Sequence, residues 1–280
     1  MIAVLGAGGQ LGTAFVDLLG DAARAVTRSE LDLENLGSIS DWVSANRPEV
    51  VINCAAYTGV DAAESEEELA GRVNALAVGE LASACAAEGS RFVTFSTDYI
   101  FDGTKDGPYV ESDRPNPLSV YGRTKAEGER LGLEANPHTL VVRSSWVVSG
   151  THPNFVATML DLIRKGTVDV VDDQRGHPTV AADLAPAVMD AVDSEVTGIL
   201  HLANDGVTTW CGLATDTARL AGLDPNRVRP ISSEQFSRPA PRPRNSVLES
   251  ERRDQLGIGS LPHYLESLPA VVESLIARGY

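Results

Sequence analysis

A tyrosine and a lysine four residues apart are the first candidates for chemistry in this sequence. Tyr121 and Lys125 lie in PLSVYGRTKAEGERL, a stretch that predicts a helix with both side chains on one face. A lysine ammonium beside a phenol favours the phenolate, so we expect Lys125 to lower the pKa of Tyr121 and make it a better proton donor. Taken alone, the pair fits a solvated helix face better, because this spacing is common.

A cluster of hydroxyl groups upstream gives the pair a context. The β-rich run RFVTFS (91–96) continues into Thr97, Asp98 and Tyr99. A Thr97 hydroxyl at the carboxyl end of a strand could hydrogen-bond a substrate carbonyl and orient the tyrosine. By itself Thr97 would be interpreted as a strand-end cap, so the argument depends on the order of several motifs.

The third motif is the glycine stretch GAGGQLG, residues 6–12, with its glycines at Gly6, Gly9 and Gly12. It follows an apolar run and opens a helical pattern. Missing side chains let the backbone approach a pyrophosphate, and the helix N-terminus offers free N–H groups to it. In this strand-loop-helix context, the stretch predicts a dinucleotide site.

The residues after the second expected strand bear on which dinucleotide binds. The stretch reads Ala25-Val26-Thr27-Arg28-Ser29 and has no carboxylate before Glu30, whereas NAD-binding units usually place an acid there. Arg28 and the two hydroxyls suit a 2′-phosphate, so we expect NADPH, with NADH also allowed. The alternative is that Arg28 is a surface residue.

The elements that must carry these residues alternate between strand and helix. Strands are expected at 2–6, 24–26, 50–55, 91–96 and 139–144, and helices at about 10–19, 37–46, 62–89 and 117–134. Continuous apolar strands in this order predict an α/β fold with a doubly wound parallel sheet of the Rossmann type. Ligands of such sheets bind beyond the carboxyl ends of the strands.

The second half of the chain is less regular. It predicts helices near 154–165 and 180–192, a strand at 168–171 and an apolar run at 199–203, whereas the proline-rich segment 236–246 cannot form a helix. We therefore expect a dinucleotide-binding domain at 1–150 and a smaller substrate-binding lobe at 151–280, interleaved with the first. The acidic run 64–68 is interpreted as compensating the dipole of the helix that follows.

Composition excludes several classes of protein. The chain has 280 residues, 43% of them apolar, and a formal net charge of −16, which disfavours nucleic acid and anionic membranes as partners. No apolar run approaches the ~20 residues that span a bilayer, and the N-terminus enters a strand at once, so a cytoplasmic protein is expected. Three cysteines and five histidines are scattered, which predicts no metal site.

Taken together, the motifs resemble those of extended short-chain dehydrogenases/reductases, and more narrowly the dTDP-4-dehydrorhamnose reductase family. The resemblance covers almost the whole chain, with the family's motifs in family order. They are GAGGQLG (6–12), NCAAYTGVDAAESE (53–66), STDYIFDG (96–103), NPLSVYGRTKAEGE (116–129), VRSSWV (142–147), DDQRGHPT (172–179) and RPAPRPRNSVL (238–248).

The resemblance implies a role for each matching residue. Tyr121 would be the proton donor, Lys125 would bind the nicotinamide ribose, and Thr97 and Asp98 would contact the substrate. Trp146 would pack near the sugar nucleotide, although without the resemblance it could equally be a core aromatic. The cofactor positions are Gly9, Gln10 and Leu11 at the pyrophosphate, Asp32 and Leu33 beside the adenine, and Ala56, Tyr57 and Thr58 beside the nicotinamide ribose.

Other residues add candidate roles to those implied by the resemblance, or differ from the family's pattern. Asn74 is a candidate for orienting the lysine through water, and Arg238, Arg242 and Arg244 for binding a diphosphate, with local salt bridges as the alternative. Tyr57 stands where some members have histidine. The stretch 13–15 lacks the glutamate with which some members bridge dimers through a metal, so we expect no Mg²⁺ and leave monomer and homodimer open.

The implied reaction is NAD(P)H-dependent reduction of the C4 ketone of a dTDP-4-dehydro-6-deoxysugar, dTDP-4-dehydro-β-L-rhamnose in the family named. Two alternatives stay open. One is a reductase of another dTDP-4-keto-6-deoxyhexose, and the other is a non-catalytic regulatory subunit that keeps the dinucleotide fold. The presence of Thr97, Tyr121 and Lys125 disfavours the regulatory subunit, because a binding module needs no acid-base set.

Overall fold

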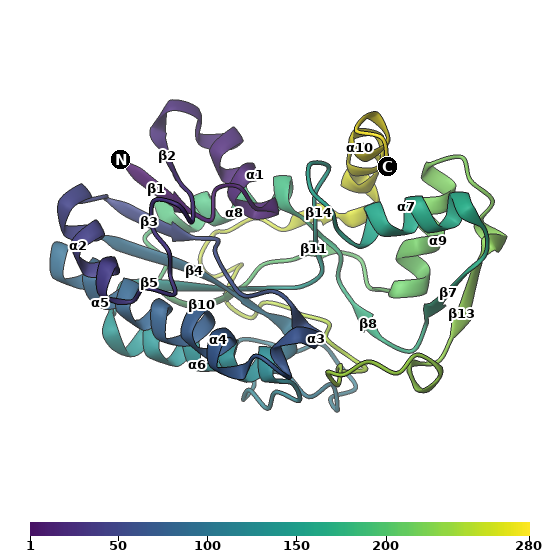
Figure 1. Ribbon diagram of the computed structural model, residues 1–280, viewed down its shortest axis with the longest axis horizontal. Helices are drawn as coiled ribbons and strands as arrows, with labels where there is room; N and C mark the ends of the chain where they lie inside the picture. The colour runs from purple at the N-terminus through teal and green to yellow at the C-terminus, as the bar shows by residue number, and fades with distance from the viewer.

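The computed structural model describes all 280 residues and is built around a six-stranded sheet (Figure 1). The strand order is β10-β5-β4-β3-β1-β2, and every neighbouring pair is parallel. This confirms the doubly wound parallel sheet that the alternating pattern predicts. The strands are β1 (Ile2–Leu5), β2 (Ala23–Val26), β3 (Val50–Asn53), β4 (Arg91–Thr97), β5 (Thr139–Ser144) and β10 (Gly198–His201).

Helices cover both faces of this sheet (Figure 1). On one face, α1 (Gln10–Leu19) and α8 (Ala181–Asp193) bury side chains such as Phe15 and Val188 against the strands. On the other, α2 (Gly37–Asn46) and α5 (Ala77–Glu88) contribute to a second core, and α6 (Val120–Ala135) packs beside α5. Apolar side chains on both faces explain why the strands read as continuous apolar runs.

The helix expected at 62–89 differs from the prediction. A short α3 (Val60–Ala63) is followed by a turn, α4 (Glu67–Gly71), a π-helical segment (Arg72–Leu76) and then α5. The π-helical segment contains Asn74, whose side chain binds the backbone of the turn after β3. A π-helical turn frequently marks a functional position, and composition carries no signal for it.

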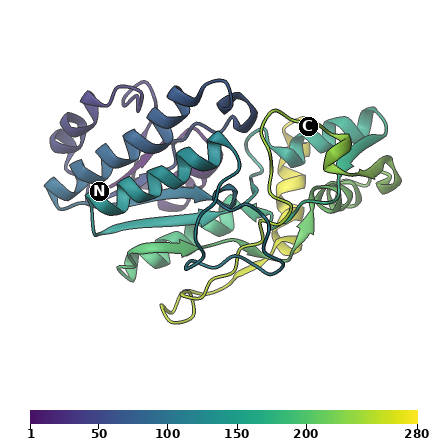
Figure 2. The same ribbon diagram turned by 90° about the horizontal axis from the view of Figure 1, so that it is seen from below.

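The second lobe lies at one end of the sheet in both views (Figures 1 and 2). Its helices α7 (Phe155–Lys165), α9 (Trp210–Leu220) and α10 (Tyr264–Ala277) enclose separate apolar cores, and segment 236–246 has no helix, as expected. Two-stranded ladders complete it. They pair β6 (Val147–Val148) with β9 (Thr179–Val180), β7 (Val168–Val171) with β13 (Val228–Ile231), β8 (Arg175–Gly176) with β12 (Thr208–Thr209), and β11 (Asn204–Asp205) with β14 (Leu261–His263).

The chain passes between the two lobes more than once. Helix α8 and strand β10, residues 181–201, belong to the six-stranded sheet and its cover although they follow α7 in sequence. We therefore propose that residues 1–150 and 151–280 form two interleaved lobes, of which the second also completes the first. No helix has the length and apolar character required to cross a bilayer.

Candidate active site

The expected proton donor stands at the start of α6, beside the end of β4. Strand β4 ends at Thr97, and Tyr121 lies in the first turn of α6. Ser119 fixes this start, because its hydroxyl accepts a hydrogen bond from the Gly122 N–H at 3.1 Å. The Thr97 hydroxyl lies close enough to the Tyr121 phenol to lower its pKa, although its own hydrogen bond goes to Asp98. The structure thus brings Thr97 and Tyr121 together.

Two further contacts hold the first turn of α6 in place. Glu64 accepts a hydrogen bond from the Val120 N–H at 2.8 Å, so this carboxylate stabilises α6, while Glu67 and Glu68 lie in the first turn of α4, the helix that follows the run. Gly122 allows the close approach, since a Cβ there would lie 2.2 Å from the carbonyl oxygen of Tyr99. The acidic run 64–68 therefore does more than sequence reasoning expected.

The pKa of Tyr121 moves in the direction opposite to the expected one. Burial of the phenol raises its pKa to about 12, and the negative charge of Asp98 adds to the rise, while the nearby Thr97 hydroxyl opposes it. The spacing predicts that Lys125 lowers the pKa of Tyr121, but this lysine is not among the groups that shift that pKa. Tyr121 is consequently held as a neutral phenol, a form that can donate a proton.

Lys125 is buried one helical turn farther along α6. Its side chain forms no hydrogen bond or ion pair with the protein, and burial lowers its pKa to about 8, with Glu129 acting in the opposite direction. A buried ammonium without a protein partner retains all of its donors for a ligand. This fits the expected contact with ribose hydroxyls.

Asp98 and Trp146 face the same region with unused polar atoms. The Thr97 hydroxyl donates to Asp98 Oδ1 at 3.0 Å, but Asp98 Oδ2 and Trp146 Nε1 are buried without a partner at hydrogen-bonding distance. Burial raises the pKa of Asp98 to about 6. Buried polar atoms normally have partners, so these two indicate where a polar ligand would complete the site.

The glycine stretch forms a tight loop before α1, with the backbone geometry expected of a phosphate-binding cradle. Gly6 has a φ of +68°, and a Cβ on Gly12 would lie 2.2 Å from the Gly6 carbonyl oxygen, so both positions require glycine. Gly9 precedes α1 and no side chain caps the helix, which leaves its first N–H groups free. A Cβ on Gly8 would meet nothing within 4 Å, so the approach from outside is open.

Gln10 connects this cradle to the second lobe. Its Oε1 accepts hydrogen bonds from the Ser149 hydroxyl and the Asn154 amide, each at 3.1 Å. His152 also reaches the carbonyl oxygen of Gly8, at 2.8 Å. Gln10 is therefore placed at the cradle as expected, but its side chain holds the loop at 149–154, whereas Leu11 packs toward the core.

The turn after β3 is fixed by Asn74. Its Oδ1 accepts from the Tyr57 N–H at 2.9 Å, and its Nδ2 donates to the Tyr57 carbonyl oxygen at 3.0 Å and to Thr124 at 3.3 Å. This amide holds Ala56, Tyr57 and Thr58 in place and contacts the residue before Lys125. Asn74 thus orients the turn directly, and its contact with the lysine through water stays a prediction.

Arg28 lies in the loop after β2, as expected for a 2′-phosphate contact. Its side chain is 71% exposed and forms ion pairs with Asp32 and Glu34. Leu33 between these acids is buried. The loop therefore presents one cation, oriented by two carboxylates, beyond the end of β2.

A cavity of about 1080 Å³ lies between the two lobes. Thr58 and Tyr99 line it from the first lobe, and Phe155, Met159 and Trp210 from the second. Half of the lining residues are hydrophobic and the rest include charged ones such as Asp61 and Arg242, a mixture that suits a ligand with apolar and charged parts. The cavity therefore joins the turn after β3 to the apolar interior of the second lobe.

Sequence reasoning missed Trp210, which forms a wall of this cavity. Its ring stacks on Trp146 with centroids 3.7 Å apart and an interplanar angle of 11°. Trp146 has a φ of +46°, which is unusual for a residue with a side chain. No local pattern marks TTWCG, so only the fold reveals the stack.

The three arginines of segment 238–244, which we call the arginine strap, lie at the mouth of the cavity or beside it. Arg238 and Arg242 line the cavity and both pair with Asp61 of α3. Arg244 instead approaches Glu234 at 3.6 Å on the surface. Sequence reasoning assigns the three arginines the same role, but in the structure only Arg238 and Arg242 line the cavity.

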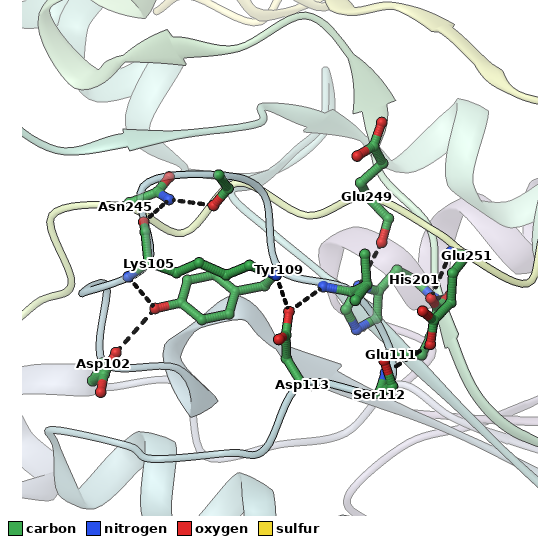
Figure 3. A network of polar contacts seen from close by, with 12 residues as sticks. Asp102, Lys105, Tyr109, Glu111, Ser112, Asp113, His201, Asn245, Glu249 and Glu251 are labelled. Atoms are coloured by element: carbon green, nitrogen blue, oxygen red, sulfur yellow. Dashed lines mark hydrogen bonds and ion pairs between the residues drawn. The ribbon is translucent and has the colours of Figure 1, made fainter.

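A polar network joins the end of the strap to the loop after β4 (Figure 3). Asn245 donates to the carbonyl oxygens of Lys105 and Gly107 at 2.7 and 2.8 Å. Glu111 accepts from the His201 N–H at 2.9 Å and from the Glu251 N–H at 2.9 Å. These contacts anchor the chain that follows the strap to the loop after β4 and to β10 of the six-stranded sheet.

A buried ion pair continues this network beneath α6. Arg143 of β5 is 1% exposed and binds Glu129 of α6 with two hydrogen bonds, at 3.0 and 2.7 Å. The same guanidinium lies 3.3 Å from the ring of His201. Burial lowers the pKa of His201 to about 4, so that ring is neutral at pH 7.

A family model described as RmlD substrate binding domain matches residues 1–277. A Streptomyces griseus protein named dTDP-4-dehydrorhamnose reductase is 45% identical over 98% of this chain and 94% of its own length. A Streptomyces niveus protein named dTDP-4-keto-6-deoxy-D-glucose reductase is 39% identical over 95% of this chain and 94% of its own length.

A solved structure is similar to this chain over nearly its whole length. A dTDP-4-dehydrorhamnose reductase from Bacillus anthracis, solved in complex with NADP, superposes with a TM-score of 0.93 at 32% identity. The similarity covers 99% of this chain and 98% of that one. The likeness therefore includes both lobes.

Proposed function

The chain belongs to the RmlD substrate binding domain family, and on that basis we propose that it is an NADPH-dependent dTDP-4-dehydrorhamnose reductase. It would reduce the C4 ketone of dTDP-4-dehydro-β-L-rhamnose to give dTDP-β-L-rhamnose. The observation that carries the proposal is the set of Thr97, Tyr121 and the unpartnered Lys125 at the end of β4 and the start of α6, in which Thr97 and Lys125 are buried and Tyr121 is half-buried.

The cofactor supplies the hydride, and the protein residues position it and handle the proton. Tyr121, held as a neutral phenol, would protonate the oxygen of the former ketone. Thr97 would hydrogen-bond that oxygen, and Lys125 would bind the ribose next to the nicotinamide. With a pKa of about 12, Tyr121 is protonated at neutral pH, the form that an acid requires, although the shift also makes it a weaker acid than a free tyrosine.

The other cofactor residues follow β1, β2 and β3, the first three strands along the chain. Gly6, Gly9, Gln10, Leu11 and Gly12 would form the pyrophosphate cradle, supported by the free N–H groups of α1. Asp32 and Leu33 would flank the adenine, and Ala56, Tyr57 and Thr58 the nicotinamide ribose. Arg28 would meet the 2′-phosphate of NADPH, and the relative solved with NADP supports that choice over NADH.

The substrate would extend from Thr97 into the cavity between the lobes. Asp98 Oδ2 and Trp146 Nε1, the buried atoms without partners, would bind hydroxyls of the sugar. The apolar part of the cavity suits the nucleoside, and the arginine strap suits the diphosphate. We also propose a cytoplasmic location, where such a sugar nucleotide would be made.

The proposed function is tested by a turnover assay with NADPH and NADH against a panel of dTDP-ketosugars. We expect rapid loss of cofactor absorbance with dTDP-4-dehydrorhamnose and a preference for NADPH. Turnover only with a different ketosugar would contradict the assigned substrate and retain the reaction class. No turnover with any ketosugar would contradict an enzymatic role.

The Streptomyces niveus relative favours one alternative, a reductase of another dTDP-4-keto-6-deoxyhexose. Reductases of this kind share the ketone and the nucleotide and differ in the configuration of the sugar ring. The same panel decides between them, because the alternative requires a higher kcat/KM with another ketosugar than with dTDP-4-dehydrorhamnose.

A further inference from the structure

Asp61 connects the first lobe to the arginine strap. It lies in α3, and its Oδ1 accepts hydrogen bonds from Arg242 Nη1 at 3.0 Å and from the Ala240 N–H at 3.2 Å. Its Oδ2 accepts from Arg242 Nη2 at 3.1 Å and from Arg238 Nη1 at 3.3 Å. Both oxygens of the carboxylate are thus used to hold the strap.

The contacts make Arg242 different from the other arginines of the strap. Its side chain is 18% exposed, whereas those of Arg238 and Arg244 are 50% and 70% exposed. Exposed ion pairs hold side chains weakly, but a partly buried two-point pair restricts the guanidinium to one orientation. The Arg242 hydrogen bond is also the largest cause that lowers the pKa of Asp61, so the pair stays ionised.

The orientation leaves one edge of Arg242 available. Asp61 occupies the end formed by Nη1 and Nη2, and the other Nη1 hydrogen bond goes to the Ala240 carbonyl oxygen at 2.9 Å. A guanidinium has five N–H donors, so Nε and the second hydrogen of Nη2 remain on the adjacent edge, where no hydrogen bond to the protein forms, although the Tyr99 hydroxyl lies near the guanidinium. That edge is a second fork of the kind that binds phosphate oxygens in pairs.

Arg242 also lies close to the reacting end of the site. It lines the cavity together with Tyr99, and its charge lowers the pKa of the Tyr99 hydroxyl, although burial raises that pKa overall. The Tyr99 ring in turn meets Tyr121 edge to face, with centroids 6.1 Å apart. A diphosphate bound by Arg242 would therefore be separated from the proposed proton donor, Tyr121, only by the side chain of Tyr99.

We propose that Asp61 is a positioning residue, which orients Arg242 so that its Nε and Nη2 bind the diphosphate of the sugar nucleotide. Without Asp61 the guanidinium would be free to turn away into solvent, and binding would lose both orientation and a fixed cation. The inference rests on the function proposed above, because it takes a nucleoside diphosphate as the ligand.

The test measures binding of dTDP to the full-length protein by calorimetry. We expect Asp61→Asn and Arg242→Gln each to weaken binding roughly 10-fold to 100-fold. The double variant should bind no more weakly than the weaker single variant, because both changes disable the same fork. Arg242→Lys retains the charge without the fork, so it should also lose about 10-fold and tests the fork with Asp61 intact.

Asp161→Asn is the matched control, since it makes the same substitution at the exposed partner of Lys165, outside the lining of the cavity. Its dTDP affinity should stay within about twofold of the wild type. NADPH affinity should be unchanged in every variant, which shows that each one is folded. In turnover, Asp61→Asn should raise the KM for the ketosugar nucleotide and leave kcat within a few-fold, a split that general destabilisation would not give.

Several results would overturn the inference. Unchanged or tighter dTDP binding by Asp61→Asn would mean that the carboxylate does not help, or that it competes with the diphosphate. Losses that add in the double variant would mean that the two residues act separately. A wild-type protein that binds no dTDP would contradict the proposed function as well, whereas normal wild-type binding with an unaffected Asp61→Asn contradicts this inference alone.

Discussion

At the scale of single residues, the central feature is a tyrosine kept neutral by its surroundings. Sequence reasoning selected Tyr121 from its spacing to Lys125 and predicted a lowered pKa. The structure raises that pKa to about 12, since burial and the nearby Asp98 both disfavour the phenolate. A residue pattern can indicate which side chains meet. The pKa of a side chain also depends on how deeply it is buried and on the charges around it, and the spacing of residues along a helix carries no information about either.

Replacing Tyr121 by phenylalanine removes the proposed acid and little else. We expect kcat to fall by roughly 10² to 10⁴-fold, the usual contribution of general acid catalysis, with NADPH affinity unchanged. Single-turnover absorbance measurements would show the loss. Tyr109→Phe is the control, because that hydroxyl binds Asp102 away from the site; wild-type turnover by Tyr121→Phe would contradict the assignment.

The pKa of Lys125 makes cofactor binding dependent on pH. Burial lowers it to about 8, so the ammonium is charged below that pH and loses its proton as the pH rises through it. We expect NADPH affinity to fall severalfold between pH 7 and pH 9, as measured by fluorescence titration. Lys125→Met should bind more weakly at every pH, without that change; an equal slope in this variant would exclude Lys125 as the titrating group.

At the scale of elements, helix boundaries follow local sequence more closely than helix interiors do. α1 and α2 have the predicted bounds, and Ser119 caps the helix that carries Tyr121. The break and the π-helical segment within 62–89 were not predictable, because they follow from contacts with the turn after β3 and with α6. Asn74 makes one of those contacts, and a glycine on α6 permits the other.

Gly128 is the position where α6 and the π-helical segment meet. A Cβ there would lie 2.1 Å from the carbonyl oxygen of Asn74, which is backbone and cannot turn aside. We expect Gly128→Ala to lower the free energy of unfolding by about 1–3 kcal/mol and to reduce turnover, since Lys125 lies one turn away on α6. Urea unfolding and steady-state rates would measure both effects.

Gly132→Ala is the control on the same helix. Its Cβ would meet a methyl group of Val78 at 3.3 Å, which can shift, and alanine favours a helix over glycine by up to ~1 kcal/mol. We expect its unfolding free energy to stay within about 1 kcal/mol of the wild type. Equal losses in the two variants would mean that the close contact with Asn74 is not what requires Gly128.

At the scale of the whole molecule, the sequence predicted the fold class and left the position of one strand unresolved. The run 199–203 reads as a strand, but its apolar pattern does not specify which sheet it joins. The structure places β10 (Gly198–His201) beside β5, at the edge of the first sheet. Asp61, Trp210 and the arginine strap likewise come together only through tertiary contacts.

The buried pair of Glu129 and Arg143 joins α6 to the sheet, and we expect it to matter for the stability of the whole molecule. Glu129→Gln leaves the guanidinium buried without its charged partner, which should cost about 3–5 kcal/mol in unfolding free energy. Asp161→Asn breaks the exposed pair with Lys165 and should cost less than about 1 kcal/mol. Chemical unfolding compares them, and similar losses would contradict the buried pair's special role.

The late position of β10 also has a consequence for how the protein is made. Translation proceeds from the N-terminus at about 5–20 residues per second, and the cofactor-binding sheet lacks its edge strand until residue 201 has left the ribosome. The core beneath α1 and α8 also requires Ile258 and Leu261. The nascent chain therefore carries an incomplete sheet for most of its synthesis, and the first lobe closes only when translation is nearly finished.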